Sequence, residues 1–326
     1  MHTNMRRSVV LLALAVATAA VSVNAAATAS SAGKVPKRIQ VPGTPLAIAA
    51  GYRSLWVAGH DGTTLYRINP RTGRIRARIG EGTNACGPLG IAYGRVWMGH
   101  CDTGTTDAVV SIRSNRLVGR VKALAYGFGF GFGSVWVDAP QQNPSLLNRV
   151  DPKNLRVLDR IQVGDGIGDA VGVGGFMWCV NTDGTLSQID PSSNRVVATI
   201  RYGGGGPAYG VVAAGKIWIL DEGDNSLYKF DPRHKSVAKL PIQLSFSSDF
   251  GDPYIAVAGS RIWFATHNPR MVAGGIDRLA EINARTGKVL RRIRLPFGFG
   301  PYFAVIGHSL WGSLPGEDVV LRIPLK

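Results

Sequence analysis

The sequence predicts an all-β fold, a seven-bladed β-propeller of four-stranded antiparallel blades. Seven tryptophans recur at intervals of 41, 39, 42, 40, 45 and 48 residues. Each follows a glycine-containing turn within a short apolar run, and each interval has room for four short strands. Such a repeat is typical of a propeller blade. The seven are Trp56, Trp97, Trp136, Trp178, Trp218, Trp263 and Trp311.

The N-terminus has the pattern of a secretory signal peptide over residues 1–25. Arg6 and Arg7 precede an apolar run from Val9 to Val23, and Val23-Asn24-Ala25 fits a small-residue cleavage site. Residues 26–34 are then a flexible mature N-terminus and residues 35–326 a single propeller domain. We expect a secreted protein, extracellular or periplasmic in the cell envelope, without a transmembrane segment after cleavage. An uncleaved leader that tethers the chain to a membrane remains open.

The net charge of +16 favours anionic partners such as cell-envelope polymers, acidic lipids or nucleic acid. The basic residues alternate along segments predicted as outer strands, where charge solvates an edge. We therefore interpret the basic residues as solvating the strand edges and expect no specific nucleic-acid binding. We also expect the protein to be a monomer. The arginines concerned include Arg67, Arg74, Arg76, Arg78, Arg156, Arg160, Arg195, Arg291 and Arg292.

Within a blade, an inner strand is followed by the tryptophan strand, a third strand and an outer strand. The turn before the outer strand begins with Asp or Asn, often followed by Pro, as in Asp151-Pro152-Lys153-Asn154. Proline presets φ and the Asx side chain accepts a backbone N–H, so these are hairpin corners.

The last blade ends on a third strand near Leu321 to Pro324, so it lacks an outer strand. The segment Arg38-Ile39-Gln40-Val41 repeats the outer-strand sequence Arg160-Ile161-Gln162-Val163 residue for residue. We predict that the N-terminal strand joins the C-terminal blade and closes the ring.

An alternating Gly/aromatic run from Tyr126 to Gly133 occupies the place of an inner strand. Alternation with period two puts the aromatics on one face, and the glycines leave room for the neighbouring blade. No helix follows, so the run is not a dinucleotide-binding loop.

The three cysteines have different predicted roles. Cys86 and Cys101 stand at neighbouring strand ends of the second blade, and in an oxidising compartment we predict a disulfide between them. Two unpaired thiols are the alternative. Cys179 replaces an apolar residue after Trp178 and is predicted to be a small core residue.

Loop insertions gather on one face of the predicted ring, after Cys101, after Asp138, before Gly251 and after His267. Loops on a rigid scaffold commonly carry binding sites, so we expect a funnel there. The residues predicted to line it are His60, His100, Asn181, Tyr209, Asp221, Glu222, Tyr254, His267 and Tyr302.

Three function classes fit such a funnel. We favour a non-catalytic binding module for a small molecule, a peptide or an anionic cell-envelope component, with no cofactor. The alternative is a metal-assisted lyase or hydrolase that uses His60, His100 or His267 with Asp221 or Glu222, and a divalent metal belongs only to this alternative. The histidines lack the tight spacing of a zinc site. The third class is a structural platform that acts through a basic rim.

From about Val35 to Lys326, repeats such as LWVAGHDGTTLYRINPRTGRIRARIG resemble the YVTN-type repeats of secreted bacterial propellers, and their Gly-Pro…Trp spacing is also similar to the virginiamycin B lyase family. The lyase resemblance implies metal-assisted elimination by histidines in Pro-His pairs at inner-strand starts. No histidine follows proline at these starts here, and Glu317 after Trp311 is out of register. The lyase mechanism therefore does not carry over, and His267 with Glu222 is the fallback pair. The corresponding pairs are Pro45-Leu46, Pro88-Leu89, Pro207-Ala208, Pro253-Tyr254 and Pro301-Tyr302.

Overall fold

The computed structural model describes residues 36–60, 63–80, 87–99, 106–123, 127–139, 145–206, 208–243, 255–266, 276–300 and 302–325. Internal contacts divide the chain into Met1–Gly33 and Lys34–Lys326, and every described residue belongs to the second unit. The expected signal peptide, residues 1–25, and the segment 26–34 lie outside the described residues. In the described part, no helix has the length and apolar character needed to cross a membrane.

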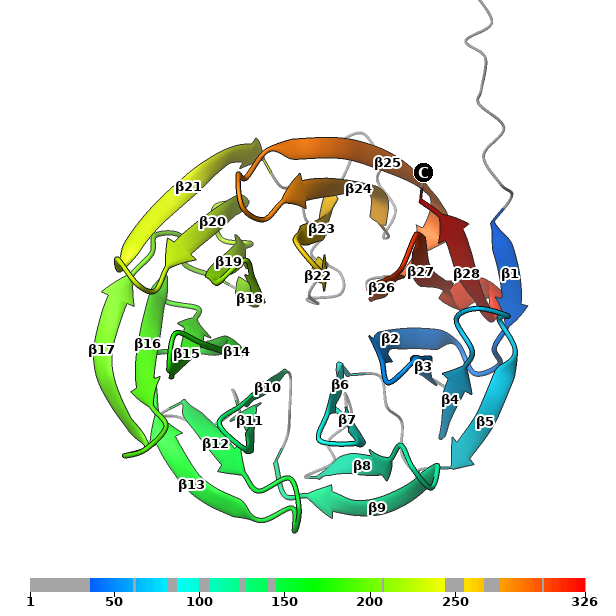
Figure 1. Ribbon diagram of the computed structural model, residues 1–326, viewed down its shortest axis with the longest axis horizontal. Coiled ribbons are helices and arrows are strands. Elements are labelled where there is room, and N and C mark those ends of the chain that lie inside the picture. Colours follow the sequence, from blue (N-terminus) through cyan, green and yellow to red (C-terminus); the bar gives the residue numbers. More distant parts are fainter. Residues whose placement is uncertain are drawn as a thin grey trace, which may run out of the picture. The chain divides into compact units, whose positions relative to one another are not determined.

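Seven four-stranded antiparallel sheets form the blades of a ring, which confirms the predicted fold (Figure 1). The inner strands are β2 (Pro45–Gly51), β6 (Leu89–Ala92), β10 (Phe128–Gly131), β14 (Ile167–Val173), β18 (Ala208–Ala213), β22 (Ile255–Ala258) and β26 (Phe303–Ile306). The second strands are β3 (Ser54–Gly59), β7 (Arg95–Met98), β11 (Ser134–Ala139), β15 (Phe176–Asn181), β19 (Lys216–Asp221), β23 (Arg261–Thr266) and β27 (Ser309–Leu314).

The outer half of each blade completes the sheet. The third strands are β4 (Thr64–Ile68), β8 (Asp107–Ser111), β12 (Leu146–Val150), β16 (Thr185–Asp190), β20 (Ser226–Asp231), β24 (Ile276–Asn283) and β28 (Val319–Pro324). The outer strands are β5 (Ile75–Gly80), β9 (Arg116–Val121), β13 (Val157–Gln162), β17 (Arg195–Arg201), β21 (Ser236–Gln243), β25 (Val289–Phe299) and β1 (Lys37–Gln40). A short 3-10 helix, η1 (Pro315–Glu317), joins β27 to β28.

The seven tryptophans lie on the second strands and are almost fully buried between blades. In five blades the indole N–H also donates to a backbone carbonyl five residues earlier, at the end of the inner strand; Trp136 to Gly131 O, at 3.1 Å, is one example. The aromatic ring thus fills the space between sheets while its polar atom is satisfied by its own hairpin. This explains why the tryptophan period marks the blades.

Glycines let the inner strands approach closely where the ring is narrowest. A Cβ on Gly129 would lie 2.5 Å from the carbonyl oxygen of Ala170, and one on Gly168 would lie 1.7 Å from that of Ala208. Phe128 and Phe130 stack on one face of β10, with ring centroids 6.4 Å apart. The predicted inner strand is therefore confirmed for Phe128–Gly131, whereas Phe132 and Gly133 form the following turn and Tyr126 lies outside the described residues.

The N-terminal strand closes the ring as predicted. β1 pairs antiparallel with β28, with Arg38 opposite Leu321 and Ile39 opposite Val320. The backbone N–H of Val41 donates to Asp318 O at 2.8 Å. Ile39 and Val41 are buried in the core shared by the last and first blades, so this pairing seals the sheet by side-chain packing as well as by hydrogen bonds.

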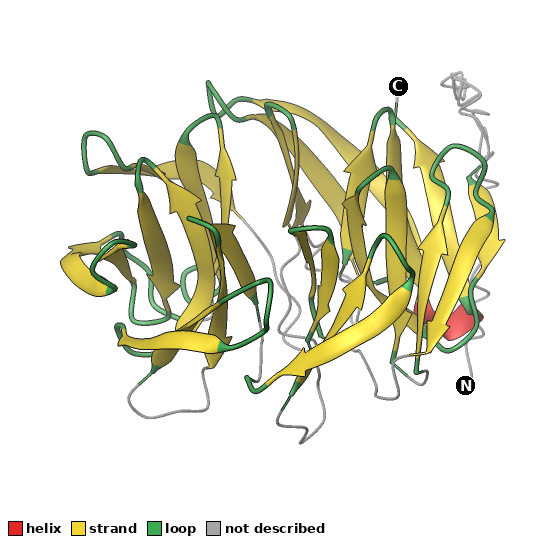
Figure 2. Ribbon diagram, turned by 60° about the horizontal axis from the view of Figure 1, so that its bottom comes forward, coloured by secondary structure: helices red, strands yellow, loops and turns green. Residues whose placement is uncertain are grey.

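The connections sort onto two faces. On the turn face lie the hairpin turns from inner to second strand and from third to outer strand. On the loop face lie the loops from second to third strand and the crossings between blades. Figure 2 shows η1 at the end opposite the described hairpin turns. The Asx corners form as predicted; Asp151, for example, accepts the N–H of Lys153 at 2.7 Å.

Two side-chain predictions have different outcomes. Cys179 is fully buried and packs with Met177 and Ile189, which confirms its core role. Arg67, predicted to alternate on an outer strand, instead lies on the third strand β4 opposite Trp56. Its guanidinium covers the indole ring, with Cζ 5.0 Å from the centroid, so the outer-strand interpretation of Arg67 is wrong.

Candidate functional site

The structure describes six of the nine predicted site residues. His60 is exposed directly after β3, and its backbone N–H donates to Thr44 O at 3.0 Å. Glu222 is partly exposed in the loop after β19. His100, Tyr254 and His267 lie outside the described residues, as do Cys86 and Cys101 with their predicted disulfide. The remaining described residues are Asn181, Tyr209, Asp221 and Tyr302.

Asn181 and Asp221 end the second strands of the fourth and fifth blades, and neither has exposed surface. The Asp221 carboxylate accepts the Tyr202 hydroxyl at 2.8 Å, the Gly205 N–H at 3.2 Å and the Asp224 N–H at 3.2 Å. These bonds tie the loop after β19 to the blade crossing that precedes β18. Asp221 therefore anchors these two loops to each other.

Tyr202 connects the two buried strand ends. Its hydroxyl also lies 3.3 Å from Asn181 O, and the Asn181 amide donates to Thr185 Oγ1 and Ser187 Oγ at 2.9 Å each. Burial, and then the neighbouring Asp221 carboxylate, raise the pKa of Tyr202. The phenol thus keeps its proton as a donor to Asp221, which fixes the loop face between these two blades.

The glycine run after Tyr202 is required by this packing. Gly204 has φ of +61°, and a Cβ there would lie 2.2 Å from Asp221 Oδ2. Only glycine allows the backbone to cross so close to a carboxylate. The sequence reasoning did not use this run, although four consecutive glycines at a blade crossing were a visible signal.

The inner strands place a set of polar residues at one height near the loop face. In the fourth, fifth and seventh blades, the position two residues before the inner-strand partner of the blade tryptophan is occupied by Asp or Tyr. The partners are Val171, Val211 and Ala304, and the residues are Asp169, Tyr209 and Tyr302.

Tyr209 and Tyr302 are 9% and 6% exposed and pack into the cores that their blades share with the next blade. Their rings thus fill space between adjacent blades near the loop-face end. Asp169 occupies the same position in the fourth blade but carries a carboxylate. Asp169 was not among the residues predicted to line the funnel.

Asp169 is the single charged residue in the described inner strands. A β-bulge lies at this point, since Ile167 pairs with Asn181 and the next pair is Ala170 with Cys179. Bulges re-aim side chains and are common next to functional sites. The carboxylate oxygen Oδ2 accepts the backbone N–H of Gly210, on the neighbouring inner strand, at 2.9 Å.

The surroundings of Asp169 are poor in charge. Within the described residues no cation pairs with it, and its other oxygen, Oδ1, receives no hydrogen bond. Burial raises the pKa of Asp169 to about 7, although the bond from Gly210 opposes this. A desolvated carboxyl with a spare oxygen is the kind of group that binding and catalytic sites use.

Within the described residues, no three His, Cys, Asp or Glu side chains gather in a way that could hold a metal ion. Near the ring axis, the described inner strands offer one carboxyl, that of Asp169, beside loops held by Tyr202 and Asp221. This arrangement can accept a hydrogen bond or a positive charge.

No protein-family model matches the chain, and no curated protein matches it. Among solved structures, Kuenenia stuttgartiensis hydrazine synthase is similar with a TM-score of 0.68 and 14% identity over 87% of this chain and 96% of that one. The Myceliophteria thermophila Cps50 (Swd1) β-propeller domain is similar with a TM-score of 0.69 and 12% identity over 90% and 100%. At such low identity these similarities show the fold alone.

Proposed function

We propose that this chain is a non-catalytic binding module that takes a ligand at the loop-face end of the ring axis, beside Asp169. The observation that carries the proposal is the carboxylate oxygen that Gly210 leaves without a partner among the described residues. A ligand with a hydroxyl, amide or ammonium group would supply the missing donor.

The wider setting of the proposal comes from the sequence. The leader pattern supports an exported protein, and the repeats support a propeller of the YVTN type. The ligand is then a small molecule, a peptide or an envelope component outside the cytoplasm. The lyase alternative has less support, because the described inner strands carry no histidine.

The proposal is tested by thermal-shift screening of small amines, alcohols and short peptides against the wild type and Asp169→Asn. Asparagine keeps an acceptor for Gly210 but removes the charge, so compounds that stabilise the wild type should lose most of that effect. Asp159→Asn, on the outer strand β13, is the matched control. Compounds that bind Asp169→Asn as tightly as the wild type would refute the site. Chemical conversion of a bound compound would show that the protein is an enzyme and contradict the non-catalytic function.

A further inference from the structure

The turn face carries three exposed aromatic rings on consecutive blades. Tyr52, Tyr93 and Phe132 are 52%, 40% and 39% exposed. Each is the first residue of the turn between the inner and second strands. No other aromatic side chain stands at this position in the remaining four blades, where the chain has Gly174, Ala214, Gly259 and Gly307.

The backbone at these positions disfavours an aromatic residue. All seven turn positions have φ between 48° and 64°, a left-handed conformation in which glycine is relaxed and a bulky side chain is strained. Three blades nevertheless place a large ring there without burying it. Strain of this kind is retained where the side chain has a task, and here that task is not core packing.

Each aromatic side chain extends from its own blade to the next one. The Tyr52 hydroxyl accepts the N–H of Gly94, in the turn of the next blade, at 2.9 Å. The Tyr93 hydroxyl donates to Ser134 O, again in the next blade, at 3.1 Å. Phe132 in turn reaches Gly172 on β14, where a Cβ would meet its Cε2 at 3.5 Å. Tyr52, Tyr93 and Phe132 therefore form a row over three consecutive blades, each reaching the next blade, and this row is called the aromatic strip below.

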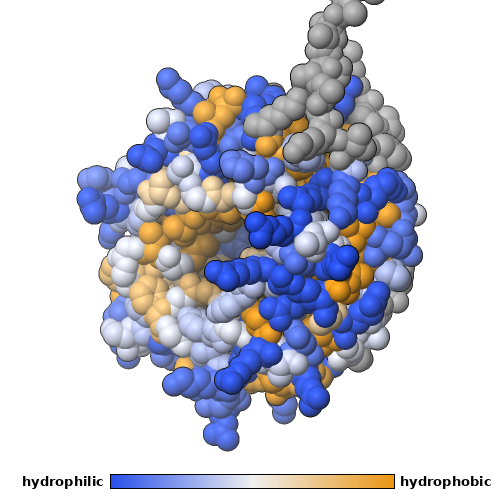
Figure 3. Space-filling model, turned by 45° about the vertical axis from the view of Figure 1, so that its right-hand side comes forward, coloured by the Kyte–Doolittle hydropathy of each residue, from blue (hydrophilic) through white to orange (hydrophobic). Residues whose placement is uncertain are grey.

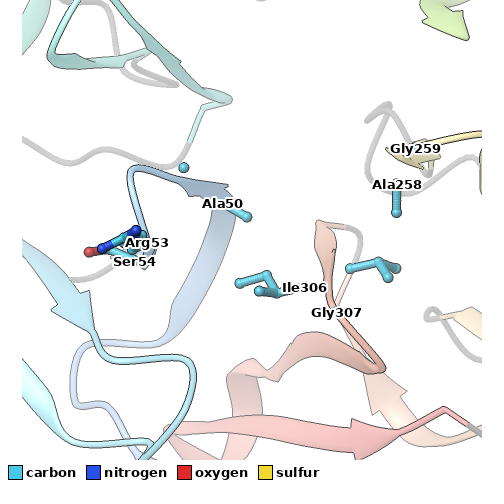
Figure 4. A pocket seen from close by; sticks show the side chains of 9 residues that line it. Ala50, Arg53, Ser54, Ala258, Gly259, Ile306 and Gly307 are labelled. Carbon is cyan, nitrogen blue, oxygen red and sulfur yellow. The ribbon is translucent and has the colours of Figure 1, made fainter.

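A cavity of about 490 Å³ adjoins the strip. It lies between the inner-strand ends of the first, sixth and seventh blades, and it stops at the turn that carries Tyr52. Figure 4 shows Ala50, Ala258 and Ile306 around this space, with Arg53 and Ser54 on the other side of their turn. Figure 3 shows a central hollow in the ring with hydrophobic residues along one side and hydrophilic ones along the other.

The charge of the turn face is strongly positive. Its acids are Asp151, Asp190 and Asp231, and each accepts a backbone N–H of its own hairpin turn. Lysines and arginines are spread over the same turns. Arg53, next to Tyr52, is exposed, and within the described residues its guanidinium has no hydrogen-bond or ion-pair partner. The face thus offers aromatic surface and uncompensated positive charge together.

We propose that the turn face binds an anionic glycan, with Tyr52, Tyr93 and Phe132 as stacking platforms and Arg53 as the counter-charge for its acidic groups. The C–H face of a pyranose ring is weakly positive and packs on the negative face of an aromatic ring. A guanidinium matches carboxylate or sulfate groups with two parallel hydrogen bonds. This site lies on the face opposite Asp169 and is independent of the function proposed for it.

Single-stranded nucleic acid also combines stacking with negative charge. The glycan is favoured because the leader pattern predicts export, where acidic polysaccharides are the abundant polyanions. A nucleic acid is therefore one outcome that the experiment must separate. The probes are a fluorescent oligouronate hexasaccharide, neutral maltohexaose and a thymidine dodecamer, compared by anisotropy at low and moderate salt.

The wild type should bind the oligouronate best, more weakly at the higher salt. Phe132→Gly and Tyr52→Gly should each weaken this binding at least about fivefold, the scale of one stacking contact. The melting temperature of Phe132→Gly should stay level or rise, because glycine is relaxed at this φ value. In Tyr52→Gly the same relief is offset by loss of the bond from Gly94, so its melting temperature should change little. Leu158→Ala, an equally exposed apolar residue on β13, is the control and should bind normally.

Arg53→Gln should reduce both affinity and salt dependence, while Arg78→Gln on the outer strand β5 should not. Asp169→Asn should leave oligouronate binding unchanged. The proposal fails if the oligouronate does not bind, if the dodecamer binds more tightly through the same residues, or if the glycine variants lower the melting temperature without changing affinity. The last result would make the aromatic strip structural.

Discussion

The guanidinium of Arg149 lies over the ring of Trp136, with Cζ 5.1 Å from the ring centroid. The two residues face each other on β11 and β12. Arg149 also donates to Ser134 Oγ at 2.8 Å, within its blade, and to Asn194 Oδ1 at 2.6 Å, in the next blade. One arginine thus covers the buried indole and fastens two blades together.

The same fastener recurs at Arg67 and Arg322. Arg67 donates to Ser54 Oγ at 2.9 Å and to Asn115 Oδ1 of the next blade at 2.8 Å. Arg322 donates to Ser309 Oγ at 3.0 Å and to Arg71 O, across the closure between the last and first blades, at 3.0 Å. Ring stability is therefore shared between apolar packing and these charged hydrogen bonds.

Arg149→Ala should lower the free energy of unfolding by about 2 to 3 kcal/mol, since it removes a cation–π contact and charged hydrogen bonds at partly buried sites. Arg149→Lys should recover part of this, because lysine keeps the charge but not the planar fork. Urea denaturation measures both. Arg160→Ala, exposed on β13, is the control, and an equal loss there would contradict the fastener.

Removal of residues 1–42 should lower the melting temperature by roughly 10 °C relative to a chain that starts at Lys34. The deletion strips β1 from β28 and exposes the sites filled by Ile39 and Val41, each worth a few kcal/mol of burial. Scanning calorimetry measures the shift. Arg38→Gln is the control, because the Arg38–Glu317 pair is half-exposed and contributes little. Equal melting of the two chains would show that β1 is dispensable.

Asp169 should make the protein less stable as pH rises from about 4 to about 7. Its pKa is raised to about 7 in the folded state, so over this range the unfolded chain releases the proton and the folded chain keeps it. Asp169→Asn should remove this loss and be more stable at pH 8, by up to about 4 kcal/mol. Urea titrations at pH 4.5 and pH 8 measure it, and a variant with the wild-type pH profile would contradict the assignment.

Tyr202→Phe should lower stability by about 1 to 2 kcal/mol, because Asp221 loses its hydroxyl donor in a buried site. The pKa of Tyr202 is raised in the fold, so wild-type stability should fall above about pH 10, where the unfolded phenol ionises. The variant should show a shallower alkaline fall in denaturation experiments. Tyr52→Phe, on the turn face, is the comparison, and an unchanged alkaline slope in Tyr202→Phe would contradict this role.

The sequence was sufficient for the ring because its signals are periodic. The tryptophan interval gives the blades, and the copy of Arg160–Val163 at Arg38–Val41 gives the closure, since both reflect backbone pairing that repeats along the chain. The basic residues that cover the tryptophans could also have been predicted from the sequence. A basic residue follows tryptophan by eleven positions at Arg67, Lys229 and Arg322, which is the distance between facing residues of neighbouring strands.

The candidate site was harder to predict because it depends on single departures from the repeat. Asp169 breaks an apolar strand, and its environment is set by Gly210 from another blade. Asn181 and Asp221 were chosen as polar residues near a mouth, but burial depends on the loops that fold over them. Tyr209 and Tyr302 were placed at the correct strand ends, while their burial depends on packing against the next blade.

The pairing of β1 with β28 also sets the order of assembly. β1 is complete by residue 40, but its partner begins at residue 319, so this strand has no place in a sheet until almost the whole chain has been made. Contacts this distant in sequence form slowly. The first six blades can each form and stack during synthesis, whereas the seventh is complete only after β28 has been made and has paired with β1. A partly synthesised or proteolytically shortened chain would therefore form an unclosed arc with two exposed blade faces. Chaperones and proteases would encounter these apolar faces.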